Sequence, residues 1–101
     1  MSGPLGHGCE VAFRLGPGRD EQARSLADDL MACADGCRRG VLFLNDAGEY
    51  GLLIEWERRV DAEGFAARPS TRAALARLGE VLGREPSLRV YRMEGFAPPQ
   101  A

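Results

Sequence analysis

Residues 41–57 read VLFLNDAGEYGLLIEWE, and this stretch decides the fold. Two apolar runs, at residues 41–44 and 50–57, flank the segment Asn-Asp-Ala-Gly at residues 45–48. Apolar runs joined by a few residues of this type are typical of a β-hairpin, in which Asn45 would serve the turn. We therefore predict two strands joined by a short turn.

Both strands of this hairpin carry apolar residues on their two faces. Successive side chains of a strand point to opposite faces, and both sets are apolar in residues 41–44 and again in residues 52–54. A chain this short has too few helices to shield both faces of a sheet, so the uncovered apolar face should associate with another molecule. We expect a homodimer that packs sheet to sheet.

The chain on either side of the hairpin alternates between strand and helix patterns. In chain order the further predicted elements are a strand at residues 10–15, a helix at 20–35 ended by Gly36, a helical zone capped by Asp61 and broken by Pro69, a longer helix capped by Ser70 and ended by Gly83, and a strand at 88–93. The order β-α-β-β-α-β predicts an α+β, ferredoxin-like sandwich, in which the helices cover one face of an antiparallel sheet.

The length of 101 residues suffices for one small domain. We expect residues 9–96 to form it, between a flexible N-terminal segment at residues 1–8 and a C-terminal tail at 97–101. Hydrophobic residues make up 45% of the chain and charged residues 28%, a balance typical of a folded domain.

The charge balance excludes a general nucleic-acid binder. The 13 basic residues are all arginine and are outnumbered by 15 acids, whereas neutralising phosphates needs a basic excess. No apolar run approaches the ~20 residues of a membrane span, and we expect no membrane association and a cytoplasmic location.

The cysteines, Cys9, Cys33 and Cys37, are interpreted as reduced thiols because they are few and odd in number. Cys33 and Cys37 have the spacing of one helix face, which is compatible with a metal-binding or redox pair. Gly36 interrupts that helix and His7 is the only histidine, so we expect no metal site.

Four stretches carry a family resemblance. They are RLGPGR at residues 14–19, Gly-Cys at 36–37, IEWE at 54–57 and RVY at 89–91. Over residues 10–96 the sequence resembles the antibiotic biosynthesis monooxygenase family, whose members are small dimeric α+β barrels. The resemblance implies oxygenation of a small aromatic molecule, anthrone- or quinol-like, often without metal or flavin, and in a subset it implies haem degradation.

Trp56 matches the tryptophan that lines the family's pocket, and it is either the candidate catalytic residue or a core residue of a buried strand. The side chains expected to complete an apolar substrate pocket are Val11, Phe13, Leu52, Ile54 and Phe65. Such a pocket would exclude water while polar groups stabilise a substrate anion. The candidate polar contributors are Tyr50, Glu55, Arg72 and Tyr91.

Several of these polar groups have two interpretations. Glu55 is either a base or the partner of an arginine such as Arg14 across the sheet. Arg72, with Arg68, lies where a helix N-terminus would hold an anion, or is simply a solvated arginine. His7 precedes the expected strand and is either a residue of a mobile tail, which is the preferred interpretation, or a general base.

The sequence departs from the family at three positions. Haem-degrading members have an asparagine on the first strand and a histidine about ten residues after the tryptophan, where this chain has Val11 or a neighbour and Ala66. Anthrone-oxidising members often have an asparagine four residues before the tryptophan, where this chain has Leu52. We therefore expect no haem and no other cofactor.

Three functions remain open. The first is a homodimeric, cofactor-independent monooxygenase. The second is a non-catalytic dimer that binds a small ligand or serves assembly. The third is an isomerase or carrier, because a fold does not fix its chemistry.

Overall fold

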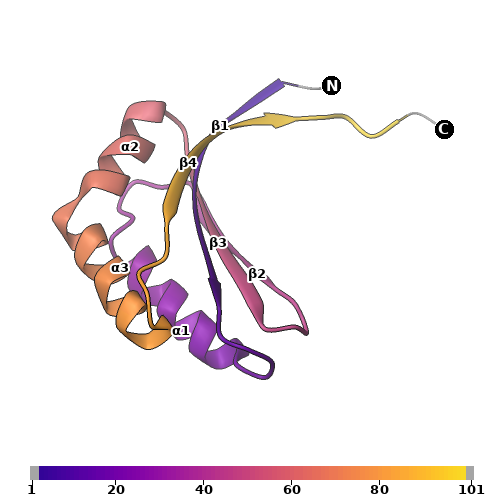
Figure 1. The fold of residues 1–101 in the computed structure, drawn as a ribbon. Helices are drawn as coiled ribbons and strands as arrows, with labels where there is room; N and C mark the ends of the chain where they lie inside the picture. The colour runs from indigo at the N-terminus through magenta and orange to yellow at the C-terminus, as the bar shows by residue number, and fades with distance from the viewer. Residues whose placement is uncertain (1–2, 100–101) are drawn as a thin grey trace.

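A four-stranded antiparallel sheet carries three helices on one of its faces (Figure 1). The computed structural model describes residues 3–99. Its elements are β1 (Gly3–Arg14), α1 (Asp20–Met31), β2 (Arg39–Leu44), β3 (Glu49–Trp56), α2 (Arg59–Ala67), α3 (Pro69–Leu82) and β4 (Leu88–Gly95). The strand order β2-β3-β1-β4 is that of a ferredoxin-like α+β fold, so the expected fold class is confirmed.

The β2–β3 hairpin forms as its sequence predicts, and Asn45 organises the turn. The Asn45 side-chain oxygen accepts hydrogen bonds from the backbone N–H groups of Ala47 and Glu49, each at 3.0 Å. Gly48 has a φ of 78°, the left-handed conformation that glycine adopts without steric cost. The turn therefore sets the register in which Leu42 faces Leu52.

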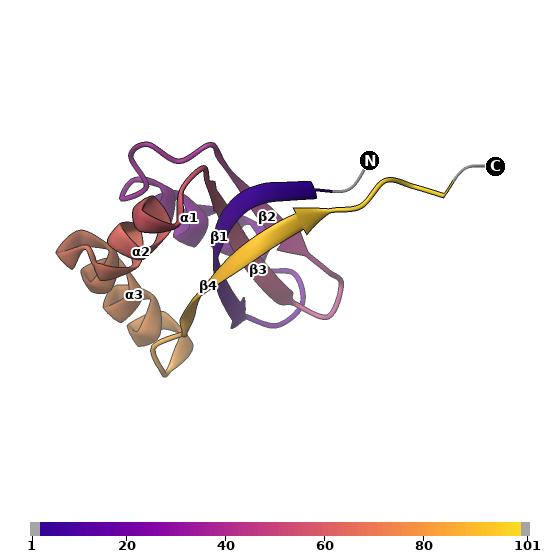
Figure 2. The ribbon, with the colours of Figure 1, turned by 90° about the horizontal axis from the view of Figure 1, so that it is seen from above.

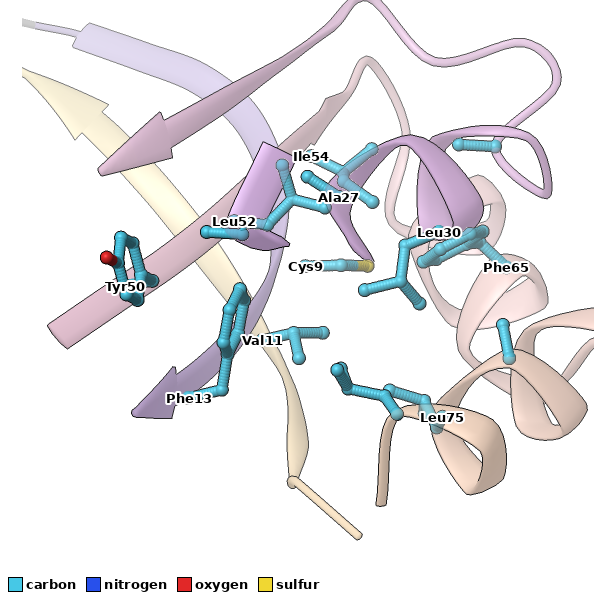
Figure 3. Close-up of a cluster of buried hydrophobic side chains, with 14 of the residues drawn as sticks. Cys9, Val11, Phe13, Ala27, Leu30, Tyr50, Leu52, Ile54, Phe65 and Leu75 are labelled. Atoms are coloured by element: carbon cyan, nitrogen blue, oxygen red, sulfur yellow. The ribbon is translucent and has the colours of Figure 1, made fainter. Parts of the chain in front are cut away.

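One face of the sheet is buried beneath the helices. On β3 every second side chain is buried, from Tyr50 to Trp56, and β1 adds Cys9, Val11 and Phe13. The helices contribute further apolar side chains, among them Ala27, Leu30, Phe65 and Leu75. Figure 3 shows these residues as one cluster, with Phe13 and Tyr50 at one end and Phe65 at the other.

The N-terminal segment differs from the expectation. Residues 3–8, expected to be a flexible segment, belong to β1, because Gly3 pairs with Gly95 and His7 pairs with both Trp56 and Arg92. Backbone hydrogen bonds to two neighbouring strands hold this glycine-rich stretch. Residues 1 and 2 lie outside the described part of the chain.

The C-terminal strand is also longer than expected and ends at Gly95 instead of residue 93. Residues 97–99 of the expected tail have no regular structure, and residues 100 and 101 lie outside the described residues. The ends of β1 and β4 run together beyond the helices (Figure 1).

Helix α1 ends at Met31, earlier than the predicted residue 35. The Arg68 guanidinium donates hydrogen bonds to the backbone oxygens of Cys33 at 2.6 Å and Asp35 at 3.3 Å. This holds the following residues in turns, so Cys33 and Cys37 do not share a helix face.

Both predicted N-caps are wrong. Helix α2 begins at Arg59, and Asp61 lies in its first turn, where the Arg58 guanidinium hydrogen-bonds both carboxylate oxygens, at 2.9 and 3.0 Å, and lowers the pKa of Asp61. Helix α3 begins at Pro69, so Ser70 lies inside it. Proline is favoured at this position because its ring fixes a helical φ and its missing N–H has no helical partner. Gly83 ends α3 with a φ of 86°, as predicted.

The other face of the sheet is covered by no helix or strand of residues 3–99, as Figure 2 shows. We call it the open face. Its side chains are Gly8, Glu10 and Ala12 on β1; Arg39, Val41 and Phe43 on β2; Gly51, Leu53 and Glu55 on β3; and Arg89, Tyr91 and Met93 on β4. No helix of the described residues is long and apolar enough to cross a membrane.

Candidate functional site

Trp56 and the expected pocket residues lie on the same side of the sheet but form part of the core. Trp56 is 1% exposed, and its ring lies 5.2 Å from that of Phe65, centroid to centroid. The Arg68 guanidinium lies over the indole at 5.6 Å. Val11, Leu52, Ile54 and Phe65 are likewise buried, and Phe13 is nearly so.

The apolar pocket expected beside Trp56 is therefore occupied by the protein's own side chains. None of three cavities found at the surface of residues 3–99 has Trp56 in its lining. Among the expected pocket residues, only Phe13 borders one of them, at the other end of β1.

One of these cavities lies close to Trp56, at the end of the sheet covered by α2. Its volume is about 240 Å³, and its lining comes from His7 on β1, from Arg59 and Glu63 on α2, and from residues 90–92 of β4. We call it the His7 cavity. His7 lies directly opposite Trp56 in the β1–β3 pairing, so the two side chains share the helix-facing side.

A close backbone approach fixes the position of His7. The preceding Gly6 has a φ of 105°, and a Cβ atom there would lie 2.5 Å from the backbone oxygen of Trp56. A β-bulge shifts the β1–β4 register at this point, between Pro4 and Gly6. The Arg38 guanidinium donates a hydrogen bond of 2.6 Å to the backbone oxygen of Leu5, which holds the same segment.

The His7 imidazole has an unused polar atom. Its Nδ1 is buried and has no hydrogen-bond partner among residues 3–99. Buried polar atoms are almost always paired, so an orphaned one is often explained by an unplaced ligand or a catalytic role. Imidazole is also the side chain best suited to exchange protons near neutral pH.

Two arginines give the His7 cavity a positive rim. Arg59 pairs with Glu63 one helical turn away, at 2.6 Å, while Arg92 makes no ion pair within the described residues. The Arg59–Glu63 pair is exposed, and such pairs contribute only about 0–1 kcal/mol, so a bound anion can compete for the arginine. The lining of the cavity thus brings together one imidazole, two arginines and the carboxylate of Glu63.

Cys9 lies on β1 two residues beyond His7 and is buried without access to the cavity. Its thiol donates a 3.4 Å hydrogen bond to the backbone oxygen of Ala62 on α2. Desolvation raises the pKa of Cys9 to about 11, and the neighbouring Trp56 side chain offsets part of this rise. Cys9 therefore stays protonated near neutral pH and is no nucleophile.

Tyr50 does not reach this site. It lies opposite Phe13 in the β1–β3 pairing, six residues along β1 from His7, which corresponds to about 20 Å. Its ring stacks on Phe13 at 5.7 Å, and its hydroxyl donates a 2.8 Å hydrogen bond to Asp20. Burial of the ring and this hydrogen bond both raise the pKa of Tyr50.

The other polar candidates are dispersed. Glu55 lies on the open face and forms an ion pair with Arg39 at 2.7 Å, whereas Arg14 pairs with Glu49 at 3.7 Å, so the expected Arg14–Glu55 contact is absent. Arg72 pairs with Glu85 at 3.6 Å. Tyr91 borders the His7 cavity, although its register places its side chain on the open face.

The sequence interpretation considered His7 as a general base but preferred to place it in a mobile tail. Counting backwards in steps of two from Phe13, Val11 and Cys9 leads to His7 on the same face, and this signal was present. The glycines and the proline around His7 favoured a different interpretation, because such residues are typical of a flexible tail.

No group of three or more metal-binding side chains comes together within residues 3–99.

Comparison with known proteins gives matches among solved structures only; no family model and no curated protein matches the sequence. Rv0793 from Mycobacterium tuberculosis is 24% identical, with 98% of each chain covered and a TM-score of 0.61. This chain shares the fold of that protein. Two further matches are named as candidate antibiotic biosynthesis monooxygenases.

The first of these, from Caulobacter crescentus, is 17% identical, covers 86% of this chain and 88% of its own, and has a TM-score of 0.63. The second, from Bordetella bronchiseptica, is 21% identical, covers 88% and 98%, and has a TM-score of 0.59. The likeness to antibiotic biosynthesis monooxygenases is thereby confirmed at the level of the fold.

Proposed function

We propose that this protein is a cofactor-independent monooxygenase that oxidises a small quinol-type or phenolic molecule in the His7 cavity. The observation that carries the proposal is that His7, whose buried Nδ1 has no hydrogen-bond partner among residues 3–99, borders a cavity also lined by Arg59 and Arg92. The fold shared with structures named as candidate monooxygenases gives it context.

The size of the cavity limits the substrate. Its volume of about 240 Å³ is below the 300–1,000 Å³ of typical ligand pockets, which favours a single aromatic ring over a three-ring anthrone. The ring would lie within the His7 cavity, with its hydroxyl group toward His7.

The chemistry assigns separate roles to the residues. His7 accepts the hydroxyl proton, and Arg59 and Arg92 stabilise the resulting anion. The electron-rich anion then reacts with oxygen itself. A hydroquinone plus O₂ gives a hydroxyquinone plus water, so one oxygen atom enters the ring, the other leaves as water, and the substrate supplies all the electrons.

Oxygen consumption with a panel of substituted hydroquinones tests this function. We expect turnover above the uncatalysed rate, and His7→Gln should lower kcat by about 100-fold or more, as for loss of a general base. Arg77→Gln, at an exposed position on α3, is the matched control and should keep full activity. Thermal unfolding of both variants checks that they fold.

The alternative function is a non-catalytic dimer that binds a small ligand or serves assembly, and it is supported by Leu52 and Ala66, which stand where the resemblance would place an asparagine and a histidine. If hydroquinones quench the fluorescence of Trp56 while no oxygen is consumed above background, the monooxygenase proposal is wrong and the binding function remains.

We also propose that two copies associate through the open face. Val41, Phe43 and Leu53 form its apolar part, and Phe43 is 52% exposed. Leu5 and Phe96, at the ends of β1 and β4 that extend beyond the helices (Figure 2), are exposed as well. Apolar groups left in water in this way favour association.

Light scattering tests the association. We expect a mass twice that of the 10.9 kDa chain, and Phe43→Arg should return the monomer mass. The control Val60→Arg also replaces an exposed apolar side chain with arginine, but on α2, and should leave the dimer intact. A monomer mass for the unmodified protein at micromolar concentration would remove this proposal.

A further inference from the structure

A second cavity lies at the other end of β1, where β4 separates from it. The β1–β4 pairing ends at Val11 and Leu88, so residues 12–14 of β1 have no neighbouring strand on that side. The connection between α3 and β4, residues 84–87, forms the facing wall. The cavity has a volume of about 630 Å³ and shares no lining residue with the His7 cavity.

Three guanidinium groups from three segments of the chain border this cavity. They belong to Arg14 on β1, Arg84 in the connection and Arg89 on β4. Arg84 and Arg89 form no ion pair within residues 3–99, and Arg14 makes only the exposed 3.7 Å pair with Glu49. In the single chain the arginines therefore remain available to an anion; Arg89 also belongs to the open face, through which two copies are proposed to associate.

The two carboxylates of the lining do not cancel this charge. Glu85 already pairs with Arg72 at 3.6 Å. Glu10 is the cross-strand neighbour of Arg89 and forms no ion pair with it. The remaining lining is largely apolar, with Ala12, Phe13, Leu82 and Pro86.

We propose that this cavity, the arginine cavity, binds an organic anion that has an apolar body and a carboxylate. Arginine forms paired hydrogen bonds with a carboxylate, which gives both strength and orientation. The volume is within the 300–1,000 Å³ range of ligand pockets and accommodates a two-ring molecule. This site is independent of the proposed oxygenation at His7.

The ligand pair 2-naphthoate and 2-naphthol tests the proposal, because the two share one ring system and differ in the carboxylate. Titration of the ¹⁵N-labelled full chain should show naphthoate shifting the amide signals of Ala12, Arg14, Ser87 and Arg89. Naphthol should bind this site at least about tenfold more weakly, and added salt should weaken naphthoate binding.

Substitutions separate a binding role from a structural one. Arg84→Gln and Arg89→Gln should each weaken naphthoate binding about tenfold, as for loss of a hydrogen bond to a charged group, while the control Arg77→Gln should not. Glu10→Gln should strengthen it, because it removes a like charge.

His7→Gln should leave naphthoate binding at the arginine cavity unchanged, because His7 lines the other cavity. The binding proposal and the oxygenase proposal can therefore fail independently of each other. The proposal is overturned if naphthol binds this site as tightly as naphthoate. It is also overturned if both arginine variants bind like the control, or if the shifted amide signals lie outside the arginine cavity.

Discussion

The two faces of the sheet are built from alternate residues of the same strands, yet they have different environments. On β3 the helix-facing residues Tyr50, Leu52, Ile54 and Trp56 are at most 4% exposed. The residues between them, Gly51, Leu53 and Glu55, are only partly buried. Apolar character alone does not distinguish the faces, because Leu53 is as apolar as its neighbours. The helices decide which set forms the core.

The charges differ between the faces as well. On the open face Arg39 and Glu55 form an ion pair beside Val41 and Phe43. On the helix-covered face, His7 with its cavity lies at one end and the Tyr50 hydroxyl, bonded to Asp20, at the other. The covered face therefore contributes the core that stabilises the single chain. The open face is left exposed and can contact another molecule.

The largest difference between the faces is expected from truncating one aromatic residue on each. Trp56→Ala should destabilise the chain by about 3–5 kcal/mol, because it leaves a cavity in the core. Phe43→Ala, at a half-exposed position on the open face, should cost the monomer about 1 kcal/mol or less. Urea unfolding at a concentration where the chain is monomeric measures both, and equal midpoints would contradict the distinction.

The buried thiol of Cys9 on the covered face should make the stability of the chain depend on pH. Because its pKa is raised from 9.0 to about 11, folding favours the protonated thiol, and this stability is complete below pH 9 and lost as pH rises through 11. The loss amounts to about 2–3 kcal/mol. Urea midpoints between pH 7 and 10.5 should fall less steeply for Cys9→Ala than for the unmodified chain. Cys33→Ala, at a partly exposed position, is the control, and its urea midpoint should fall with pH as in the unmodified chain. If the midpoint of Cys9→Ala falls just as steeply as that of Cys33→Ala, the Cys9 thiol does not contribute to the pH dependence of stability.

Arg68 joins the covered face to the turns after α1. Arg68→Ala should destabilise the chain by about 2 kcal/mol, because it removes a cation–π contact with Trp56 and hydrogen bonds to two backbone oxygens. Thermal unfolding compares it with Arg77→Ala on the exposed side of α3, which should change stability by less than about 0.5 kcal/mol. Similar losses in both variants would mean that Arg68 is only a surface residue.

The smallest effect is expected on the open face. Glu55→Gln should cost the monomer less than about 1 kcal/mol, because the Arg39–Glu55 pair is partly exposed. A double-mutant cycle with Arg39→Gln isolates the pair. A coupling free energy above about 1 kcal/mol in the monomer would contradict the exposure of this pair on an open face. A coupling free energy that rises with protein concentration would instead locate the pair in an interface between two copies.

The periodicity of the sequence predicted most of the architecture. The hairpin around Asn45, the end of α3 at Gly83 and the fold class all follow from local patterns of apolar and turn residues. The starts of α2 and α3 and the end of α1 did not follow. Ser70 and Asp61 have the chemistry of N-caps, but Pro69 already begins one helix, and Arg58 binds Asp61 in the first turn of the other.

The candidate site was predicted only in part. The side chains expected around Trp56 do lie together, because alternation along β1 and β3 places them on one face. Alternation cannot tell whether such a group encloses a ligand or fills its own space. Here Phe65 and Arg68, brought in from α2 and the α2–α3 junction, close around the indole.

The sequence by itself determined the strands, the helices and the two-faced sheet, because these depend on periodic patterns that a few neighbouring residues set. Only the tertiary structure decided that residues 3–8 continue β1, since their strand is held by backbone bonds to residues far along the chain. It likewise placed His7 opposite Trp56 beside a cavity, and gathered Arg14, Arg84 and Arg89 around another. Both cavities lie between segments that are distant in sequence, and no local pattern encodes such a space.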